Sequence, residues 1–275
     1  MASVLIFLQT EMECPIPWGW FHFMWIFIGA SVLISLVVNK NRSDSKQRWV
    51  LFIYGFVALI LELSKQFIWT YTYNQTTGDI IQDYQWYAAP FQFCSTPMYI
   101  ALICSALKPS VIRNVLLSYL SYFTILGGFM TMIIPNSCFT SDILVNIHTM
   151  WLHCGSLVIS CYLLISQAVK PKLHNYINGL MVFVSLTLTA LVINIGVYQS
   201  GILNGETFNM FYISPYFVSD LPVFNIIQAN VPYFIFLLSY ILAIGLGAFI
   251  VYSITNLIVK FSFTCSYLQK NKIFK

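Results

Sequence analysis

Residues 90–107 read PFQFCSTPMYIALICSAL, an apolar segment of membrane length that contains a thiol, Cys94, and a proline, Pro97. A proline inside a helix cannot donate its backbone hydrogen bond, and its ring pushes against the preceding turn. We therefore expect a membrane helix that is kinked or loosened beside Cys94. Such a position suits chemistry, and it equally suits packing alone.

The composition predicts an integral membrane protein. Hydrophobic residues make up 59% of the 275 positions and charged residues 8%, whereas a soluble domain has roughly 45–50% and about 25%. Apolar runs of about 20 residues mark membrane helices. Seven such runs lie near residues 18–38, 49–69, 90–107, 111–134, 145–168, 177–198 and 232–260. We expect an all-α bundle of seven transmembrane helices that forms a single domain over residues 1–275.

The charges alternate as this segmentation requires. Twelve of the thirteen cations lie on one side: Lys40, Arg42, Lys46, Arg48, Lys108, Arg113, Lys170, Lys172, Lys260, Lys270, Lys272 and Lys275. Seven of the nine acids lie on the other: Glu11, Glu13, Asp79, Asp83, Asp142, Glu206 and Asp220. Because basic residues stay cytoplasmic in short loops, the amino terminus is predicted outside or lumenal and the carboxyl terminus cytoplasmic. The net charge of +4 does not indicate a nucleic-acid partner, because the cations orient the protein in the membrane and contact anionic lipids.

The second predicted helix contains LELSKQFIW, in which Glu62, Lys65 and Gln66 share one face at spacings of three and four residues. Placing a charged side chain within a membrane segment costs free energy. Such a residue is therefore first interpreted as functional. The alternative is a structural ion pair, with Lys65 extending to the outer interface. In either case the face must look into the bundle.

The fifth predicted helix carries a polar stripe in which His153 is the titratable member. The stripe consists of Asn146, Thr149, His153, Ser156 and Ser160, at offsets 0, 3, 7, 10 and 14. These offsets follow one helix face, which we expect to contact protein or water. His153 is a candidate base, and a satisfied structural histidine is the alternative. His148 lies at the outer edge of the same helix.

The polar residues fall at a shared depth. With a rise of about 1.5 Å per residue, Cys94, His153 and Glu62 lie within roughly 12 Å of the outer surface. The same slab holds four further polar residues, His22, Lys65, Gln66 and Asn194. For His22, a ring at the membrane interface is the alternative. We expect one polar pocket that opens toward the outer leaflet, with Cys94 facing His153. The loop 199–231, about thirty residues long, is a candidate lid or contact segment.

A cysteine beside a histidine can carry out acyl transfer. The imidazole takes the thiol proton, the thiolate attacks a carbonyl, and the thioester passes its acyl group to an alcohol or amine. Burial disfavours a thiolate, so His153 or Lys65 would have to favour it. Gln92, Asn194 or Lys65 could donate to the oxyanion. On a regular helix Gln92 and Cys94 point about 200° apart, so both reach one pocket only if the helix start is irregular.

The order and spacing of several stretches resemble those of the YwaF-type integral membrane proteins of bacteria, which are related to a eukaryotic transmembrane acyltransferase of ether-phospholipid remodelling. The stretches are WFHFMWI, LELSKQFIW, PFQFCSTPMYIAL, ILGGFMTMIIP, HTMWLHCGSLVISCYLL, FNMFYIS and ANVPYFIF. The resemblance implies that a fatty acyl chain moves through a cysteine thioester onto a lysophospholipid, with Cys94 and His153 in the catalytic positions. Bacterial members often carry a histidine two residues before the cysteine, where this chain has Gln92.

On this reading the expected partners are membrane phospholipids or lysophospholipids, with no cofactor and no metal. The expected location is the endoplasmic reticulum or another endomembrane in a eukaryote, and the plasma membrane in a bacterium. The alternative function is a transporter or small-molecule receptor that binds its ligand through Glu62 and Lys65. A G-protein-coupled receptor is disfavoured, because the third helix ends in LKPS and the last lacks an NPxxY pattern. A disulfide between Cys14 and Cys138 is left open.

Overall fold

The computed structural model describes residues 2–38, 43–74, 76–135 and 138–273, with side chains described up to residue 261. Three of the cations that predicted the orientation, Lys40, Arg42 and Lys275, lie outside the described residues, as do the side chains of Lys270 and Lys272.

The chain forms a helical, multi-pass membrane protein. Within the described residues, six helical stretches are long and apolar enough to cross a membrane. They are α2 (Trp20–Val38), α3 (Asp44–Ile68), the pair α5 (Val111–Tyr122) and α6 (Thr124–Ile133), α7 (Ile143–Ile165), α8 (Leu173–Gln199) and the first part of α10 (Tyr233–Ile273). These six correspond to six of the seven predicted segments.

The remaining predicted segment, residues 90–107, is helical only over α4 (Thr96–Ala106). Eleven residues rise about 16 Å, roughly half of a hydrocarbon core. Residues 90–95 form turns, and Pro97 lies in the first turn of α4, where its missing N–H costs no helical hydrogen bond. Of the predicted kink or loosening, the kink is wrong, because the proline starts the helix instead of bending it. The chain beside Cys94 is irregular, since Cys94 lies in the turn just before α4.

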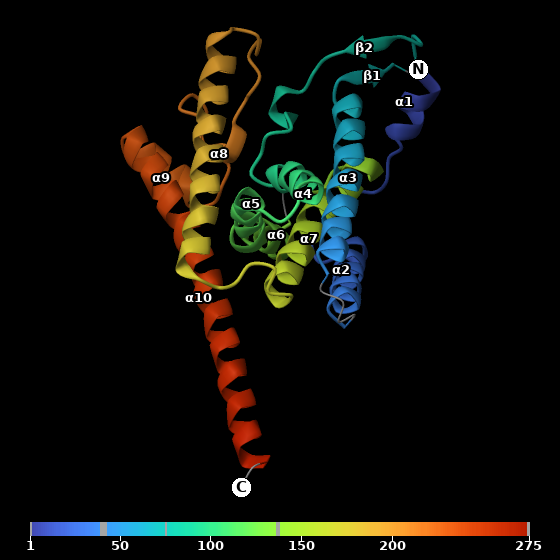
Figure 1. Ribbon diagram of the computed structural model, residues 1–275. Coiled ribbons are helices and arrows are strands. Elements are labelled where there is room, and N and C mark those ends of the chain that lie inside the picture. The colour runs from blue at the N-terminus through green and yellow to red at the C-terminus, as the bar shows by residue number, and fades with distance from the viewer. Residues whose placement is uncertain (1, 39–42, 75, 136–137, 274–275) are drawn as a thin grey trace.

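Shorter elements gather at the end of the bundle that holds the amino terminus, and the carboxyl terminus lies at the opposite end (Figure 1). They are α1 (Ala2–Leu8), the antiparallel strands β1 (Tyr71–Tyr73) and β2 (Ile80–Gln82), η1 (Trp86–Ala88), η2 (Met210–Tyr212) and α9 (Phe224–Asn230). We call this end the hairpin end. The loop 199–231, which was predicted as a lid or contact segment, contains η2 and α9.

Close backbone contact fixes the centre of the bundle. Helix α3 packs on α4 and α7, while α5 packs on α7 and α8. A side chain at Gly128 on α6 would place its Cβ only 2.7 Å from the carbonyl oxygen of His153. Glycine is therefore required where α6 crosses α7, because no Cβ fits between the two backbones.

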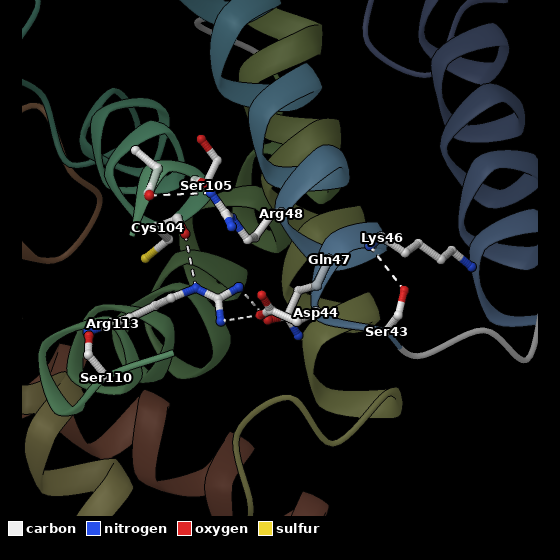
Figure 2. A network of polar contacts seen from close by, with 10 residues as sticks. Ser43, Asp44, Lys46, Gln47, Arg48, Cys104, Ser105, Ser110 and Arg113 are labelled. Carbon is white, nitrogen blue, oxygen red and sulfur yellow. Dashed lines mark hydrogen bonds and ion pairs between the residues drawn. The ribbon is translucent and has the colours of Figure 1, made fainter. Parts of the chain in front are cut away.

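At the opposite end, two arginines hold the carboxyl end of α4 (Figure 2). The buried Arg113 donates from Nε to the Cys104 carbonyl at 2.9 Å, and its Nη1 pairs with Asp44 Oδ1 at 2.7 Å. Arg48 donates from Nε to the carbonyl of Ser105 at 2.7 Å. The last carbonyls of a helix lack partners within the helix. Here the guanidinium groups supply them, so the short helix is anchored to α3 and α5.

We expect Arg113→Ala to lower the free energy of unfolding by about 2–3 kcal/mol, because it breaks a charge pair and leaves the Cys104 carbonyl without its donor. The loss stays below that of a fully buried pair, since the Asp44 side chain is 40% exposed. Thermal unfolding in detergent measures the effect. The exposed Lys108, five residues earlier, gives the matched control, and equal melting temperatures for Arg113→Ala and Lys108→Ala would contradict the assignment.

Candidate functional site

Cys94 lies in the turn that leads into α4, and aromatic rings and a hydroxyl pair fix that turn. Phe93 packs edge-on against Tyr119 and Phe211, with ring centroids 6.4 and 5.8 Å apart. Thr96, the first residue of α4, forms a 2.7 Å hydrogen bond with the Tyr119 hydroxyl. The irregular helix start that would allow Gln92 and Cys94 to share surroundings is therefore present, and it is rigidly packed.

The half-buried sulfur of Cys94 interacts electrostatically with a charged pair and with several tyrosines. The Lys65 cation and the Glu62 carboxylate are the strongest charged neighbours of the thiol. The hydroxyl groups of Tyr54, Tyr119 and Tyr212 are near enough that a charge on Cys94 would act on them. Cys94 therefore sits between α3, α4, α5 and the η2 segment, in the interior of the bundle.

His153 approaches the same part of the fold from α7. Its ring lies near the Gly127 backbone. The ring of Phe93, the residue before Cys94, lies 3.2 Å from where a Cβ on Gly127 would be. The Cys94 turn and the His153 ring thus share one neighbour on α6. No hydrogen bond between Cys94 and His153 occurs among the contacts of the described residues, so their facing one another stays a prediction.

His153 differs from the other members of its stripe. Ser156 bonds the Tyr54 hydroxyl at 2.8 Å, and Ser160 bonds the Thr124 hydroxyl at 2.7 Å. Asn146 exchanges two hydrogen bonds with the backbone of Thr140, at 2.8 and 2.9 Å. The stripe therefore faces protein. The Nδ1 atom of His153, by contrast, is buried and has no hydrogen-bond partner among the residues described.

Glu62 is the centre of a buried charged network. Its side chain is 1% exposed, and Oε1 lies 2.7 Å from Lys65 Nζ and 2.7 Å from Gln66 Nε2. His148 Nε2 approaches Oε2 at 2.9 Å, but the two atoms are not aligned as a hydrogen bond. The face that was predicted from Glu62, Lys65 and Gln66 is therefore confirmed as an interior one, and α7 adds His148 to it.

Lys65 does not extend to the interface. Its side chain is buried, and Nζ lies 5.6 Å from the centre of the Trp69 ring. Gln66 completes the network toward the hairpin end, since it donates to the Ala88 carbonyl at 2.7 Å and accepts from the Tyr84 hydroxyl at 2.8 Å. Tyr84 and Tyr54 were not predicted as site residues. A tyrosine in a polar loop or on an apolar helix carries no sequence signal that would single it out.

Gln92 and Asn194 hold the backbone of the loop that contains η2. Gln92 donates to the Asn209 carbonyl at 3.0 Å and accepts from the Phe211 N–H at 2.9 Å. Asn194 forms the same kind of pair with Met210, at 2.8 and 2.9 Å. In each amide the oxygen accepts from the loop and one of the two N–H groups donates to it, so both side chains are oriented toward the loop backbone. Together they hold the backbone around Phe211, whose ring packs against Phe93 in the turn that carries Cys94.

His22 belongs to a different part of the hairpin end. Its Nδ1 accepts from the Trp18 N–H at 3.2 Å, and its ring lies 6.1 Å from that of Phe139. Among the described residues, the hydrogen bond and ring contacts of His22 involve neither Glu62 nor His148. His22 therefore stabilises the start of α2. Nearby, Cys14 and Cys138 are not joined by a disulfide bond.

The fold and this interior define a class of protein: a multi-pass helical membrane protein with a thiol, a buried imidazole and a charged network inside its bundle. A family model described as the TMEM164 family matches residues 16–252, which include every residue of the site. The chain belongs to the TMEM164 family. No curated protein matches the chain, and no solved structure does.

Proposed function

We propose that the protein is a membrane-embedded lipid acyltransferase that moves a fatty acyl chain through a thioester on Cys94 to a lysophospholipid-like acceptor. The observation that carries the proposal is the convergence on Gly127 of the Cys94 turn and of His153, whose buried Nδ1 lacks a hydrogen-bond partner among the described residues. A buried nitrogen normally has a partner, so an exception calls for a reason. A proton from the thiol would supply that partner during the reaction.

The reaction conserves its protons and electron pairs. His153 takes the thiol proton, and the thiolate of Cys94 attacks the ester carbonyl of a phospholipid. The lysophospholipid alkoxide leaves and takes the proton back from the imidazolium. In the second half, the acceptor hydroxyl gives its proton to His153 and attacks the thioester. The thiolate leaves and regains that proton, so the protein is unchanged after one cycle.

Burial disfavours a thiolate, so the proposed reaction needs a nearby cation to offset that cost. Lys65 is the cation that acts on the Cys94 sulfur, and an opposite charge favours the thiolate. The Glu62 carboxylate would oppose this effect, but Lys65, Gln66 and His148 all lie within 2.9 Å of its oxygens. Its negative charge is therefore largely balanced. Lys65 is also a candidate for stabilising the oxyanion, because its ammonium group has three N–H donors and Glu62 is its ion-pair partner at only one oxygen.

We further propose one domain with seven membrane segments, in which α4 is the short one. The cations Lys46, Arg48 and Arg113 lie together near the start of α3 and of α5 (Figure 2), and Lys108 lies in the loop that joins α4 to α5. The acids Glu11 and Asp142 lie at the hairpin end, where their chain segments form an antiparallel bridge. This distribution supports a cytoplasmic carboxyl terminus and an outer or lumenal hairpin end.

Lipid exchange tests the proposal and separates it from the transporter or receptor alternative. Purified protein in vesicles receives a phospholipid with a deuterated acyl chain and a lysophospholipid with a different headgroup. We expect the deuterated chain to appear on the second headgroup, and Cys94→Ala to stop the transfer. A ligand-binding protein would instead show no exchange, with ligand binding that survives Cys94→Ala and fails in Glu62→Gln.

A further inference from the structure

An apolar groove lies between α2, α3 and α7, away from the polar network. Its volume is about 220 Å³, and it is lined from Trp25 to Leu36 on α2, from Val50 to Tyr54 on α3 and from Trp151 to Ile159 on α7. All three helices are long and apolar enough to cross a membrane. The lining residues Val32 and Ile53 are 45% and 52% exposed, so the groove opens on the side of the bundle that faces lipid.

The polar atoms of the lining are nearly all engaged within the protein. The Trp151 indole N–H donates to the Tyr54 carbonyl at 3.1 Å, and the Tyr54 hydroxyl bonds Ser156. The Cys154 thiol donates to the Trp25 carbonyl at 3.3 Å. The exception is the indole nitrogen of Trp25, which is buried and has no hydrogen-bond partner among the described residues. Buried N–H groups are seldom left without an acceptor.

Trp25, whose indole nitrogen is unpartnered among the described residues, lies toward one end of the groove. Trp25 is in the second turn of α2 near the hairpin end, whereas Val32 and Leu36 lie two and three turns farther along the groove. A bound molecule that matches this lining has a hydrogen-bond acceptor near Trp25 and a hydrocarbon chain along the rest of the groove. An acyl ester has this pattern, and in a bilayer its source is a phospholipid. The volume is below the roughly 300–1,000 Å³ of a site that encloses a whole ligand, so it suits part of one chain.

The groove adjoins the proposed site through shared residues. Tyr54 lines the groove, and its hydroxyl interacts electrostatically with Cys94. Cys154, which also lines the groove, follows His153 directly in the sequence and bonds Trp25. Gly155 leaves room for Tyr54, because a Cβ at that position would lie 2.7 Å from the tyrosine ring.

From these observations we propose that the groove binds one acyl chain of a phospholipid, with the ester carbonyl accepting the Trp25 indole N–H. The further assignment of this chain as the one that Cys94 attacks rests on the proposed function. The binding itself does not, because it follows from the shape and hydrogen bonding of the groove.

Photocrosslinking in phosphatidylcholine vesicles tests the binding. The probe is a phosphatidylcholine with a diazirine midway along one ester-linked chain, and the crosslinked peptides are mapped by mass spectrometry. We expect crosslinks on α2, α3 and α7 in the wild type and in Cys94→Ala. Val32→Trp and Ile53→Trp, which fill the groove from two different helices, are expected to lower these crosslinks at least fivefold. Val192→Trp on α8, 70% exposed and outside the groove, is the matched control.

A second probe with an ether-linked chain isolates the contact with Trp25. We expect the wild type to prefer the ester probe about five- to tenfold, the effect of one hydrogen bond, and Trp25→Phe to remove this preference. Crosslinks that stay unchanged in both filling variants, or that form only with a free diazirine fatty acid, would overturn the proposal. Crosslinks that behave as expected in a protein that exchanges no lipid would uphold the groove and overturn the acyltransferase function.

Discussion

Cys94→Ala is expected to abolish acyl exchange between phospholipids, with a fall in rate of about 10³-fold or more. The proposed reaction passes through a covalent intermediate on this sulfur, and alanine has no atom that can form it. Exchange of a deuterated acyl chain in vesicles measures the effect. The packing change is small, because alanine keeps Cβ and only the sulfur is removed.

Cys161→Ala provides the control for the removal of a thiol. Cys161 lies on α7 in a half-buried position, and its sulfur is not among the strongest electrostatic neighbours of Cys94. We expect this variant to exchange lipid at the rate of the wild type. A Cys94→Ala protein that retains exchange while Cys161→Ala loses it would show that the wrong cysteine has been assigned.

The second large effect is expected for His153→Gln, which should slow exchange about 10²- to 10⁴-fold, the usual contribution of a general base. Glutamine keeps polar atoms at this position but cannot take up the thiol proton. The same exchange assay measures it, together with thermal unfolding to show that the bundle is intact. Because Nδ1 of His153 has no partner among the described residues, losing it removes no protein hydrogen bond seen in the structure.

His174→Gln, an exposed histidine at the start of α8, is the matched substitution and should leave exchange unchanged. If His153→Gln melts like the wild type and exchanges lipid equally fast, His153 is a structural residue and another base must act. His148 would then be the next residue to test, since it lies one turn away on α7 and its charge influences the His153 ring.

Most of the membrane segments could be predicted because apolar run length alone determines them. The interior face of Glu62, Lys65 and Gln66 could be predicted for an equally direct reason, since the spacing along a helix fixes which residues share a side. The start of α4 could not. A proline in an apolar run is compatible with a kink or with a helix start. Here the packing of Phe93 on Tyr119 and Phe211 holds the preceding residues in a turn, so the helix starts at the proline.

The role of Gln92 and Asn194 was beyond sequence reasoning, because it depends on an irregular loop. Phe211 and Tyr212 have φ angles of 58° and 57°, in the left-handed region that residues with bulky side chains rarely adopt. Sequence signals for this conformation are glycine or asparagine, and neither occupies these two positions. The strained turn is held by the hydrogen bonds of the two amides to its backbone and by the burial of Phe211. No pattern in the sequence indicates these contacts.

The central claim is that Cys94 carries the acyl chain, and mass spectrometry of the protein itself tests it most directly. Protein incubated with a deuterated phospholipid and no acceptor is denatured, digested and analysed with and without hydroxylamine, which cleaves thioesters. The account predicts a deuterated acyl adduct on the peptide that contains Cys94, lost on hydroxylamine treatment and on addition of a lysophospholipid before denaturation. Lipid exchange that proceeds without any adduct on Cys94, or with a thioester on a different cysteine, would contradict it.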